Sequence, residues 1–551
     1  MSKNLSELSG RKGGLNKNLF EELGVAAQET GTPDLDTLEK LSASFLVGKS
    51  NLYGSVSFYD FLKPENRGKK VYICNGSSCL TAGTQDALSE KIGQHFKPEE
   101  IGEMCCLGRC HENSSFHIDG RNYSGTDIDH ITSIINDKAT TVEKYNVGHI
   151  GTPILTAPYG SVEEYYQIFK DCIKIPASQL LSDFKNSGVR GRGGAGFSMA
   201  FKLESCRNQQ DETKFIVCNA DEGDPGAYSD RYIMEERPHS LLMGMMIAGY
   251  IAGAKYGVVY IRGEYPESVR IISEAIADLR RHNLLGENIE ESGFDFQFKV
   301  IKAQGAYICG EETALLSSIE GQRPEVRVRP PYPTQQGLFN KPTVVNNVET
   351  LANLPWIIKN GGKAFAAIGT PKASGTKLIS LDGYFNKPGL YEVDMGTPLK
   401  DLLYGLGGGF RKPVKAMHIG GPLGGLVPVT SIDKLTVDFD SFAKEGFLLG
   451  HASVVCIPED YPLVHYLEHL FRFTAHESCG KCFPCRLGST RGYEMLEKAQ
   501  TENYKIDIKL MRDLLDTLEA GSLCALGGGL PLPIKNAMKY FESELAPYFK
   551  S

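Results

Sequence analysis

The sequence predicts a multidomain α/β protein that ends in a helical region. Its 551 residues exceed what one hydrophobic core supports, and the length indicates three or four domains. Helices and strands alternate from about residue 162 to residue 365, which is typical of an α/β layer. Cysteines gather in two clusters near opposite ends of the chain, so we expect a chemical site at each end.

The N-terminal part is expected to comprise a helical lead-in and a small thioredoxin-like domain, over residues 1–64 and 65–145. The lead-in is predicted because apolar residues recur at helical spacing in residues 18–28 and 35–47. The β-α-β-β-α order that follows predicts the thioredoxin-like domain. Its strand, amphipathic helix, hairpin and closing helix are expected at residues 69–74, 84–96, 114–123 and 126–138. Asp119-Gly120 is a strong signal for the hairpin turn.

The rest of the chain divides into three expected domains. They are a nucleotide-binding α/β domain, a small ubiquitin-like (β-grasp) module and a helical domain, over residues 146–365, 366–440 and 441–551. In the first of these, apolar strands are expected at residues 214–220, 256–263 and 296–303. In the second, a hairpin is expected over 376–396, followed by a short helix with Thr397 at the N-cap and Pro398 at its first position.

Charge and hydropathy point to a soluble, cytoplasmic protein. The formal net charge of −8 argues against a nucleic-acid surface. The N-terminus lacks the apolar region of a secretory signal, and the longest apolar run, Leu241–Ala254, is too short to span a bilayer. We read that run as a buried helix. A reducing compartment disfavours disulfides, so the clustered cysteines are expected to bind metal or to perform redox chemistry.

The C-terminal cysteines have the spacing of an iron–sulfur site. Cys479, Cys482 and Cys485 form a C-x2-C-x2-C run, and the last cysteine of the chain, Cys524, follows at a distance. A four-iron cluster needs four thiolates, and bacterial ferredoxins begin with such a run. Structural zinc is the alternative, with His476 as a further ligand candidate.

The N-terminal cysteines predict a second site. Cys74 and Cys79 are followed by Cys105, Cys106 and Cys110, so two loops offer four ligands for a two-iron cluster. Zinc and a redox-active cysteine pair are the alternatives. Spacing alone leaves open whether Cys105 or Cys106 is the ligand.

A glycine-rich segment and acidic strand ends indicate a nucleotide or flavin site. Residues 188–197 contain G-x-G-x-x-G, but a helix is expected before it, so it is not an ordinary dinucleotide fingerprint. Glycines still let backbone N–H groups approach a phosphate or a flat ligand. Arg190 and Arg192 add positive charge. Acidic residues follow two predicted strands, where α/β sheets bind ligands: Asp221, Glu222 and Asp224, and Glu311 and Glu312.

Five segments together resemble one family: "RGRGGAGF", "CNADEGDPG", "GAYICGEETALL", "KPTVVNNVETL" and "ESCGKCFPCRLG". It is the NADH-oxidising flavoprotein subunit of respiratory complex I and its soluble relatives. Those relatives are the diaphorase subunits of NAD-reducing hydrogenases and of NAD-dependent formate dehydrogenases. The segment with "VYICNGSSC" and "CCLGRC" looks like the thioredoxin-like two-iron subunit, here joined to the same chain.

The resemblance implies a Rossmann-like domain that binds FMN and NADH, with hydride passing directly to FMN and no catalytic protein residue. The implied FMN-binding residues are Gly191, Gly193, Lys202, Asn219, Asp221, Tyr307, Gly310, Glu311, Asn346, Asn347 and Thr350. The implied NADH-binding residues are Phe197, Asp224, Glu312, Arg329 and Tyr332. The implied [4Fe-4S] ligands are Cys479, Cys482, Cys485 and Cys524, and the implied [2Fe-2S] ligands are Cys74, Cys79, Cys106 and Cys110. Cys105 would then be spare.

Some positions depart from the family pattern. "GDPGA", residues 223–227, is more like the soluble enzymes than like complex I, and Ser205 stands where an aromatic residue is expected. The resemblance therefore implies a subunit of a soluble formate dehydrogenase or hydrogenase, with an iron–sulfur subunit and a catalytic subunit as partners. A complex I-like NADH dehydrogenase, a non-catalytic electron-transfer scaffold and a zinc-stapled binding module are the alternatives.

Overall fold

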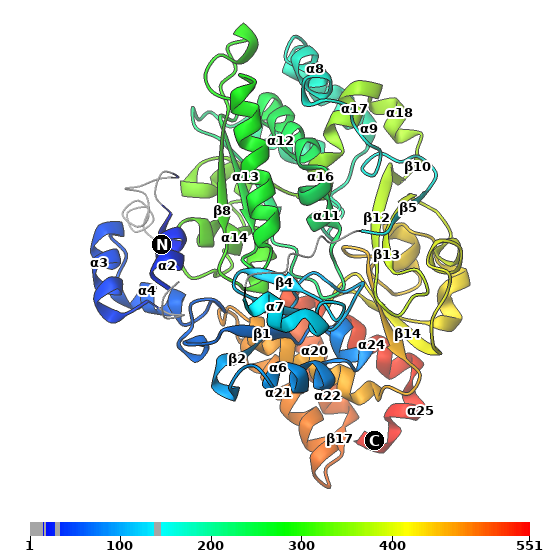
Figure 1. Cartoon of the computed structure of the whole chain (residues 1–551). Coiled ribbons are helices and arrows are strands. Elements are labelled where there is room, and N and C mark those ends of the chain that lie inside the picture. Colours follow the sequence, from blue (N-terminus) through cyan, green and yellow to red (C-terminus); the bar gives the residue numbers. More distant parts are fainter. Residues whose placement is uncertain (1–14, 16–17, 28–32, 137–144, 551) are drawn as a thin grey trace.

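The computed structural model describes residue 15 and residues 18–27, 33–136 and 145–550. Within the described chain, three sheets have four or more strands, and the C-terminal part is helical (Figure 1). The end of the predicted thioredoxin-like domain and much of the first 32 residues lie outside the described residues.

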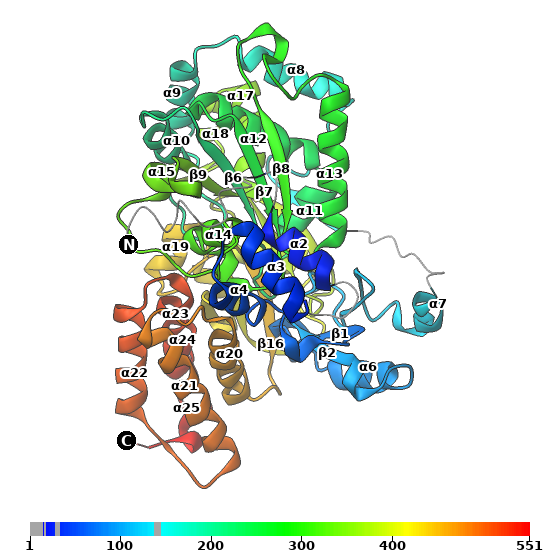
Figure 2. The same ribbon diagram turned by 90° about the vertical axis from the view of Figure 1, so that its left-hand side faces the viewer.

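The N-terminal lead-in is helical, as predicted, in its described part. Its helices are α2 (Leu19–Ala27), α3 (Leu35–Phe45) and α4 (Lys49–Val56). Asp34 caps α3, because its carboxylate accepts a hydrogen bond from the N–H of Thr37. Leu19, Phe20 and Leu23 share one hydrophobic core with α14 (Glu312–Ile319). The lead-in therefore packs on the central domain, and Figure 2 shows α2 beside α14.

The thioredoxin-like part contains a four-stranded sheet in the order β2-β1-β3-β4. The strands are β1 (Val71–Cys74), β2 (Ile101–Met104), β3 (Phe116–Ile118) and β4 (Arg121–Tyr123). The helices are α5 (Ser77–Ala82), α6 (Gln85–Gly93) and α7 (Ile131–Ile135). The predicted hairpin is confirmed, with both Asp119 and Gly120 at positive φ. The predicted β-α-β-β-α order was wrong in omitting β2, which is four residues long and pairs in parallel with β1.

The central sheet is parallel and has the order β8-β7-β6-β9. Its strands are β6 (Phe215–Ala220), β7 (Tyr256–Ile261), β8 (Gln297–Lys302) and β9 (Thr343–Asn347). The apolar run read as a buried helix is α12 (Pro238–Ala252), which is buried along nearly its whole length. The chain runs from β6 outward to β8 and then returns to the other side of β6. Such a reversal opens a crevice at the carboxyl ends of β6 and β9, where α/β sheets bind ligands.

The second large sheet is mixed and has the order β15-β14-β16-β12-β13-β5. Its strands are β5 (Val147–Ile150), β12 (Thr376–Leu381), β13 (Gly389–Asp394), β14 (Val414–Ile419), β15 (Gly425–Pro428) and β16 (Ser453–Pro458). The predicted hairpin is confirmed as the antiparallel pair β12 and β13. The sheet also includes β5 and β16, which lie outside the expected range 366–440.

The short helix expected from Thr397, with Pro398 at its first position, begins one residue later, at Leu399. Pro398 bridges to Thr436, and its carbonyl accepts from the N–H groups of Asp401 and Leu402. From Asp401 to Leu406 (η7) the helix has wide, π-type turns. Pairing of Pro398 with a distant segment therefore displaces the helix start by one residue.

The C-terminal part is helical. Its helices are α20 (Leu463–Glu477), α21 (Phe483–Thr501), α22 (Ile508–Gly521), α23 (Ala525–Gly529), α24 (Pro531–Tyr540) and α25 (Glu542–Leu545). Leu470, Leu515 and Leu518 are buried between them. Among the described helices, none combines the length and the apolar character that crossing a membrane requires.

Candidate functional site

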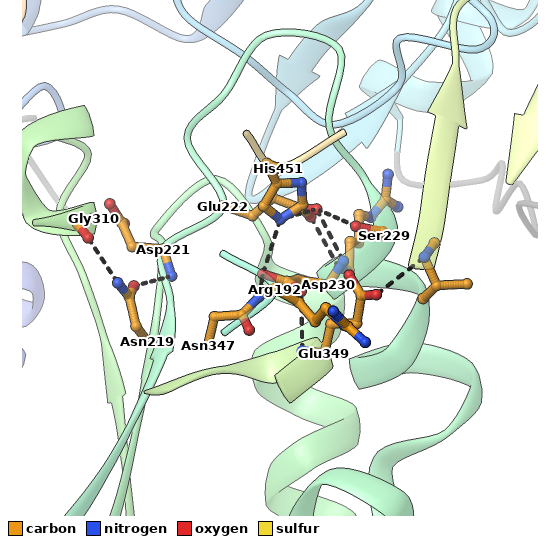
Figure 3. A network of polar contacts seen from close by, with 12 residues as sticks. Arg192, Asn219, Asp221, Glu222, Ser229, Asp230, Gly310, Asn347, Glu349 and His451 are labelled. Atoms are coloured by element: carbon orange, nitrogen blue, oxygen red, sulfur yellow. Dashed lines mark hydrogen bonds and ion pairs between the residues drawn. The ribbon is translucent and has the colours of Figure 1, made fainter. Parts of the chain in front are cut away.

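The crevice at the carboxyl ends of β6 and β9 is lined by amide and carboxylate side chains. Asn219 lies near the end of β6 and Asp221 follows that strand, while Asn346 and Asn347 end β9. The Nδ2 of Asn219 donates to the carbonyl of Gly310 at 2.7 Å, which ties β6 to the turn after β8 (Figure 3). Polar groups from both neighbouring strand ends therefore converge. Asp221 was expected at such an end from the sequence, whereas Asn346 and Asn347 were implied by the resemblance.

The glycine-rich segment forms the loop between α9 (Ala177–Ser187) and α10 (Met199–Arg207). The N–H of Gly191 bonds the carbonyl of Phe197 at 2.8 Å, so the loop closes on itself. A Cβ atom at Gly193 would lie 3.0 Å from the Cβ of Asn347, so a larger residue would crowd this side chain where the loop passes β9. The preceding helix, expected from the sequence, excludes the ordinary strand–loop–helix fingerprint.

The two arginines of the loop do not face the crevice, contrary to the role suggested by their charge. Arg190 donates to the carbonyl oxygens of Gly196 and Lys372, and Arg192 donates to the carbonyl of Ser374. Arg192 is fully buried, and burial lowers the pKa of its guanidinium to about 10. Both arginines therefore brace the loop against residues 372–374.

A cavity of about 190 Å³ lies between the loop, the sheet and the C-terminal helices. Seven of the eleven predicted FMN-binding residues line it: Gly193, Asn219, Asp221, Tyr307, Gly310, Glu311 and Asn347. The other four, Gly191, Lys202, Asn346 and Thr350, are not among its lining residues. Thr350 is buried in α16 (Val348–Ala352), where its hydroxyl oxygen accepts from the N–H of Arg192.

The donors and acceptors around this cavity suit FMN. Within the described chain, Asp221 Oδ2 and Asn346 Nδ2 are buried without a hydrogen-bond partner. A buried polar atom without a partner costs about 1–3 kcal/mol, so a ligand that satisfies both is favoured. Burial raises the pKa of Asp221 well above its usual range. A carboxyl, an amide and a close glycine backbone match the ring and the hydroxyl groups of the flavin, so the residues fit the cofactor.

Four of the five predicted NADH-binding residues lie outside this cavity. Arg329 forms ion pairs with Glu311 at 2.5 Å and with Glu312 at 2.9 Å. Lys202 donates to Glu312 at 3.0 Å and to the carbonyl of Val345. The rings of Phe197 and Tyr332 are half-exposed, at 50% and 54%. These charges and exposed rings offer contacts for the phosphates and bases of a dinucleotide.

The fifth predicted NADH residue, Asp224, lies inside the cavity. The hydroxyl of Tyr307 donates to its carboxylate at 2.6 Å. The N–H of Tyr307 donates to Glu477 at 2.8 Å, and Glu477 ends the helix before the C-terminal cysteines. This pair of bonds connects the cavity wall to the start of the cysteine loop.

The four C-terminal cysteines come from three segments. Cys479 lies in the loop after α20, Cys482 precedes α21, Cys485 is in its first turn, and Cys524 precedes α23. A Cβ atom at Gly527 would lie 2.7 Å from the Cβ of Cys485, so α23 approaches α21 closely beside the thiols. Burial raises the pKa of the Cys485 and Cys524 thiols to about 11 and about 12. A group of four thiols from two helix starts and a loop fits a cluster of four irons.

The N-terminal cysteines are also gathered. The sulfur atoms of Cys106 and Cys110 lie 3.3 Å apart, and the N–H of Gly76 points to Cys74 Sγ at 3.4 Å. Cys79 Sγ lies 3.8 Å from the hydroxyl of Ser115. All four predicted ligands are buried, whereas Cys105 is partly exposed. The geometry supports Cys106 over Cys105 as the ligand, which stays a prediction.

Three polar residues that the sequence reasoning did not select also lie at the cavity (Figure 3). Glu222, Asp230 and His451 are all buried, and one ligand-type atom from each lies within 4.8 Å of the others. Glu222 was noticed as part of an acidic run. His451 carries no local signal, because it reaches the cavity from the turn before β16, more than 200 residues away.

Comparison with known proteins identifies three family regions. Residues 11–139 match the thioredoxin-like [2Fe-2S] ferredoxin family, residues 184–356 match the Nuo51 FMN-binding domain, and residues 465–548 match the NADH-ubiquinone oxidoreductase-F iron-sulfur binding region.

Individual relatives agree with these matches. The NADP-reducing hydrogenase subunit HndC of Solidesulfovibrio fructosivorans is 41% identical over 74% of this chain and 84% of its own length. The NAD-reducing hydrogenase HoxS subunit alpha of Cupriavidus necator is 31% identical over 92% of this chain and 87% of its own. The mitochondrial NADH dehydrogenase (ubiquinone) flavoprotein 1 of Dictyostelium discoideum is 36% identical over 67% of this chain and 79% of its own.

A solved structure agrees with these sequence relatives. A chain in the crystal structure of an NAD+-reducing [NiFe]-hydrogenase in the H2-reduced state superposes with a TM-score of 0.85 at 27% identity, covering 97% of this chain and 93% of that chain. With FMN, [4Fe-4S] and [2Fe-2S] domains in one polypeptide, the chain belongs to the family of NADH dehydrogenase or diaphorase flavoprotein subunits.

Proposed function

We propose that the chain is the NAD(H)-linked diaphorase subunit of a soluble formate dehydrogenase or hydrogenase. FMN, when bound, exchanges a hydride with NADH or NAD+ and exchanges single electrons with iron–sulfur clusters. One observation carries the proposal. Ala525 and Leu526, which follow Cys524 directly, line the nucleotide cavity, so the expected [4Fe-4S] site adjoins the cavity wall.

The chain's own residues are proposed to bind and orient. The backbone at Gly193 and Gly310, with Asn219, Asp221 and Asn347, would hold FMN in the crevice. Side chains at the outer edge, including Phe197, Glu312, Arg329 and Tyr332, would hold NADH over it. The remaining proposed FMN contacts are Gly191, Lys202, Tyr307, Glu311, Asn346 and Thr350.

The proposed [4Fe-4S] ligands are Cys479, Cys482, Cys485 and Cys524, and the proposed [2Fe-2S] ligands are Cys74, Cys79, Cys106 and Cys110. The central sheet would be the Rossmann-like domain, the mixed sheet the β-grasp module, and the C-terminal helices the cluster-binding bundle.

The partners are proposed to be an iron–sulfur subunit and a hydrogenase or formate dehydrogenase catalytic subunit, in the cytoplasm. Support comes from the relatives named as hydrogenase subunits and from the "GDPGA" segment. A complex I-like NADH dehydrogenase is the alternative, because another relative is named as a flavoprotein of an NADH dehydrogenase (ubiquinone).

Anaerobic purification, metal analysis and an NADH:ferricyanide assay test the proposal. We expect NADH turnover, about six irons per chain from the two clusters, and no zinc. FMN-loaded protein with intact clusters and no turnover would instead support an electron-transfer scaffold. Zinc in place of iron would support a zinc-stapled module. Nickel in the native complex would identify a hydrogenase partner, and molybdenum or tungsten a formate dehydrogenase partner.

A further inference from the structure

The oxidation of NADH releases a proton, which needs an acceptor. NADH becomes NAD+ by losing two electrons and one proton. The clusters of the proposed function carry the electrons away, but they do not carry the proton. A group on the cavity wall that accepts it has to be buried near the site, reachable from the cavity and poised to titrate near neutral pH.

Three side chains from separate segments meet at the cavity wall. Glu222 lies in the loop after β6, Asp230 lies at the start of α11 (Ser229–Glu236), and His451 lies in the turn before β16. The Nε2 of His451 is 3.4 Å from Asp230 Oδ2 and 3.6 Å from Glu222 Oε1. Figure 3 shows His451 above the two carboxylates.

The surroundings fix both carboxylates. Glu222 Oε1 accepts from the hydroxyl of Ser229 at 3.3 Å and from the N–H of Asp230 at 2.9 Å. Its Oε2 accepts from the N–H of Arg231 at 3.0 Å. Asp230 Oδ1 accepts from Asn347 Nδ2 at 3.2 Å, so the cluster touches a proposed flavin residue.

His451 is also buried, but one of its two ring nitrogens, Nδ1, makes no hydrogen bond with the described part of the chain. It stands between Gly450 and Ala452, which both have positive φ, at 57° and 68°. Its side chain is 6% exposed, and among the residues described its Nδ1 has no hydrogen-bond partner. One imidazole nitrogen therefore faces the carboxylates, and the other has no protein partner among the described residues.

We propose that Glu222, His451 and Asp230 form a proton-accepting site at the cavity wall. Glu222 accepts the proton, and the positive charge of His451 stabilises the ionised form of Glu222. The inference rests on the proposed function. The step balances: the C4–H bond of NADH breaks, its two electrons would pass by way of bound FMN to the clusters, and its proton would form an O–H bond on Glu222 before leaving to solvent. In the reverse direction the same site returns the proton.

The protonation equilibria agree with these roles. Burial, and next the charge of Asp230, raises the pKa of Glu222 to about 7, although His451 and two backbone N–H groups lower it. Burial lowers the pKa of His451, but the hydrogen bond to Asp230 and the two carboxylate charges outweigh it and raise the pKa to about 9. Glu222 therefore titrates near neutrality beside a permanent imidazolium.

Further charged and titratable groups lie around the site, in the loop of Glu222 itself, between β7 and α13 (Pro266–Arg281), in β12 and in α16. Tyr265 approaches Glu222 Oε2 at 3.4 Å, and Arg262 donates to the carbonyl of Glu222. Asp224 and Lys377 act on His451 through their charges, and Lys377 is itself paired with Glu349. Arg262 and Lys377 are buried cations with carboxylate partners of their own, so His451 is the cation that faces both Glu222 and Asp230.

Two variants with a matched control test the proposal on FMN-loaded protein with intact clusters. The wild-type NADH:ferricyanide rate should rise about tenfold from pH 6 to pH 8, as a base with a pKa of about 7 ionises. Glu222→Gln should abolish that rise. His451→Gln should move it upward by about 1–2 pH units, because Glu222 loses its counter-charge. His465→Gln, on the exposed side of α20, should behave as wild type.

A second readout does not depend on turnover. Infrared difference spectra of wild type against Glu222→Gln should show a protonated carboxyl that disappears with a midpoint near pH 7, and at higher pH in His451→Gln. An unchanged pH profile in Glu222→Gln, or no such carboxyl signal, would overturn the inference while leaving the proposed function intact. A stoichiometric metal other than iron that is lost in His451→Gln would also overturn it. Wild-type protein without turnover would refute the proposed function, and the infrared titration would still decide the proton site.

Discussion

Gly244 lies at a very close contact between two helices behind the proposed flavin site. It lies in α12 where this helix crosses α16, the short helix that is capped by Asn347 and contains Thr350. A Cβ atom at residue 244 would lie 2.0 Å from the carbonyl oxygen of Leu351. Since ordinary contact begins at about 3.4 Å, Gly244→Ala has to displace α16 by about 1 Å.

Two opposing effects set the change in the free energy of unfolding that we expect for Gly244→Ala. Alanine is favoured over glycine in a helix interior by about 1 kcal/mol. Overpacking a tight core costs about 1–3 kcal/mol, and more where the obstacle is backbone, as the carbonyl of Leu351 is. We expect a net loss of about 2 kcal/mol in the free energy of unfolding. The shift of α16 should also weaken the contacts of Asn347, raising the Kd for FMN about tenfold, or about 1.4 kcal/mol.

The assay is chemical denaturation of the anaerobically purified protein together with fluorescence titration of FMN. Gly93→Ala is the matched control, because Gly93 ends α6 and an added Cβ there would meet nothing within 4 Å. It should leave FMN affinity unchanged and stability equal or slightly higher. If Gly244→Ala unfolds and binds FMN like wild type, the crossing of α12 and α16 does not position the site and the reasoning is refuted.

Three further outcomes test the cofactor assignments. Cys524→Ala should remove the four-iron signal from the electron paramagnetic resonance spectrum of reduced protein and keep the two-iron signal; an unchanged four-iron signal would contradict Cys524 as a ligand. Cys105→Ala should keep the two-iron signal and Cys106→Ala should lose it, and the opposite pattern would reverse the assignment. Arg329→Gln should raise the KM for NADH by about tenfold at unchanged FMN content, since a charge-assisted contact is worth about 1.5–3 kcal/mol; an unchanged KM would place NADH elsewhere.

Much of the flavin crevice could be predicted from the sequence because its signals are local. Asp221 and Glu311 follow two apolar strands of a parallel sheet and both line the cavity, whereas Asn219 and Asn347 were implied only by the resemblance. Glycines at 191 and 193 indicated a close backbone approach to a ligand, which stays a prediction; the structure shows Gly193 close to the side chain of Asn347.

The parts that were missed depend on distant residues. β2 is only four residues long and gains its stability from pairing with β1, so its pattern is too short to stand out. The helix expected from Pro398 begins one residue later, because Pro398 itself pairs with the distant Thr436. His451 joins Glu222 only because β16 enters the sheet beside the flavin domain, and no spacing along the chain encodes that meeting.

The loop after β6 connects the cavity to both groups of cysteines. Its Asp224 bonds Tyr307, whose N–H bonds the end of the helix before the C-terminal cysteines. Its Gly226 donates an N–H to Cys110 Sγ at 3.2 Å. At Gly226 φ is 103° and an added Cβ would lie 2.6 Å from Val455, so another residue would not present that N–H in the same place. A donor to a cluster sulfur favours the more negative, reduced cluster and raises its potential. The loop after β6 thus helps to hold the thioredoxin-like part, together with bonds from Arg231, Arg262 and Gly383. If Cys110 binds a cluster, the N–H of Gly226 would raise the potential of that cluster.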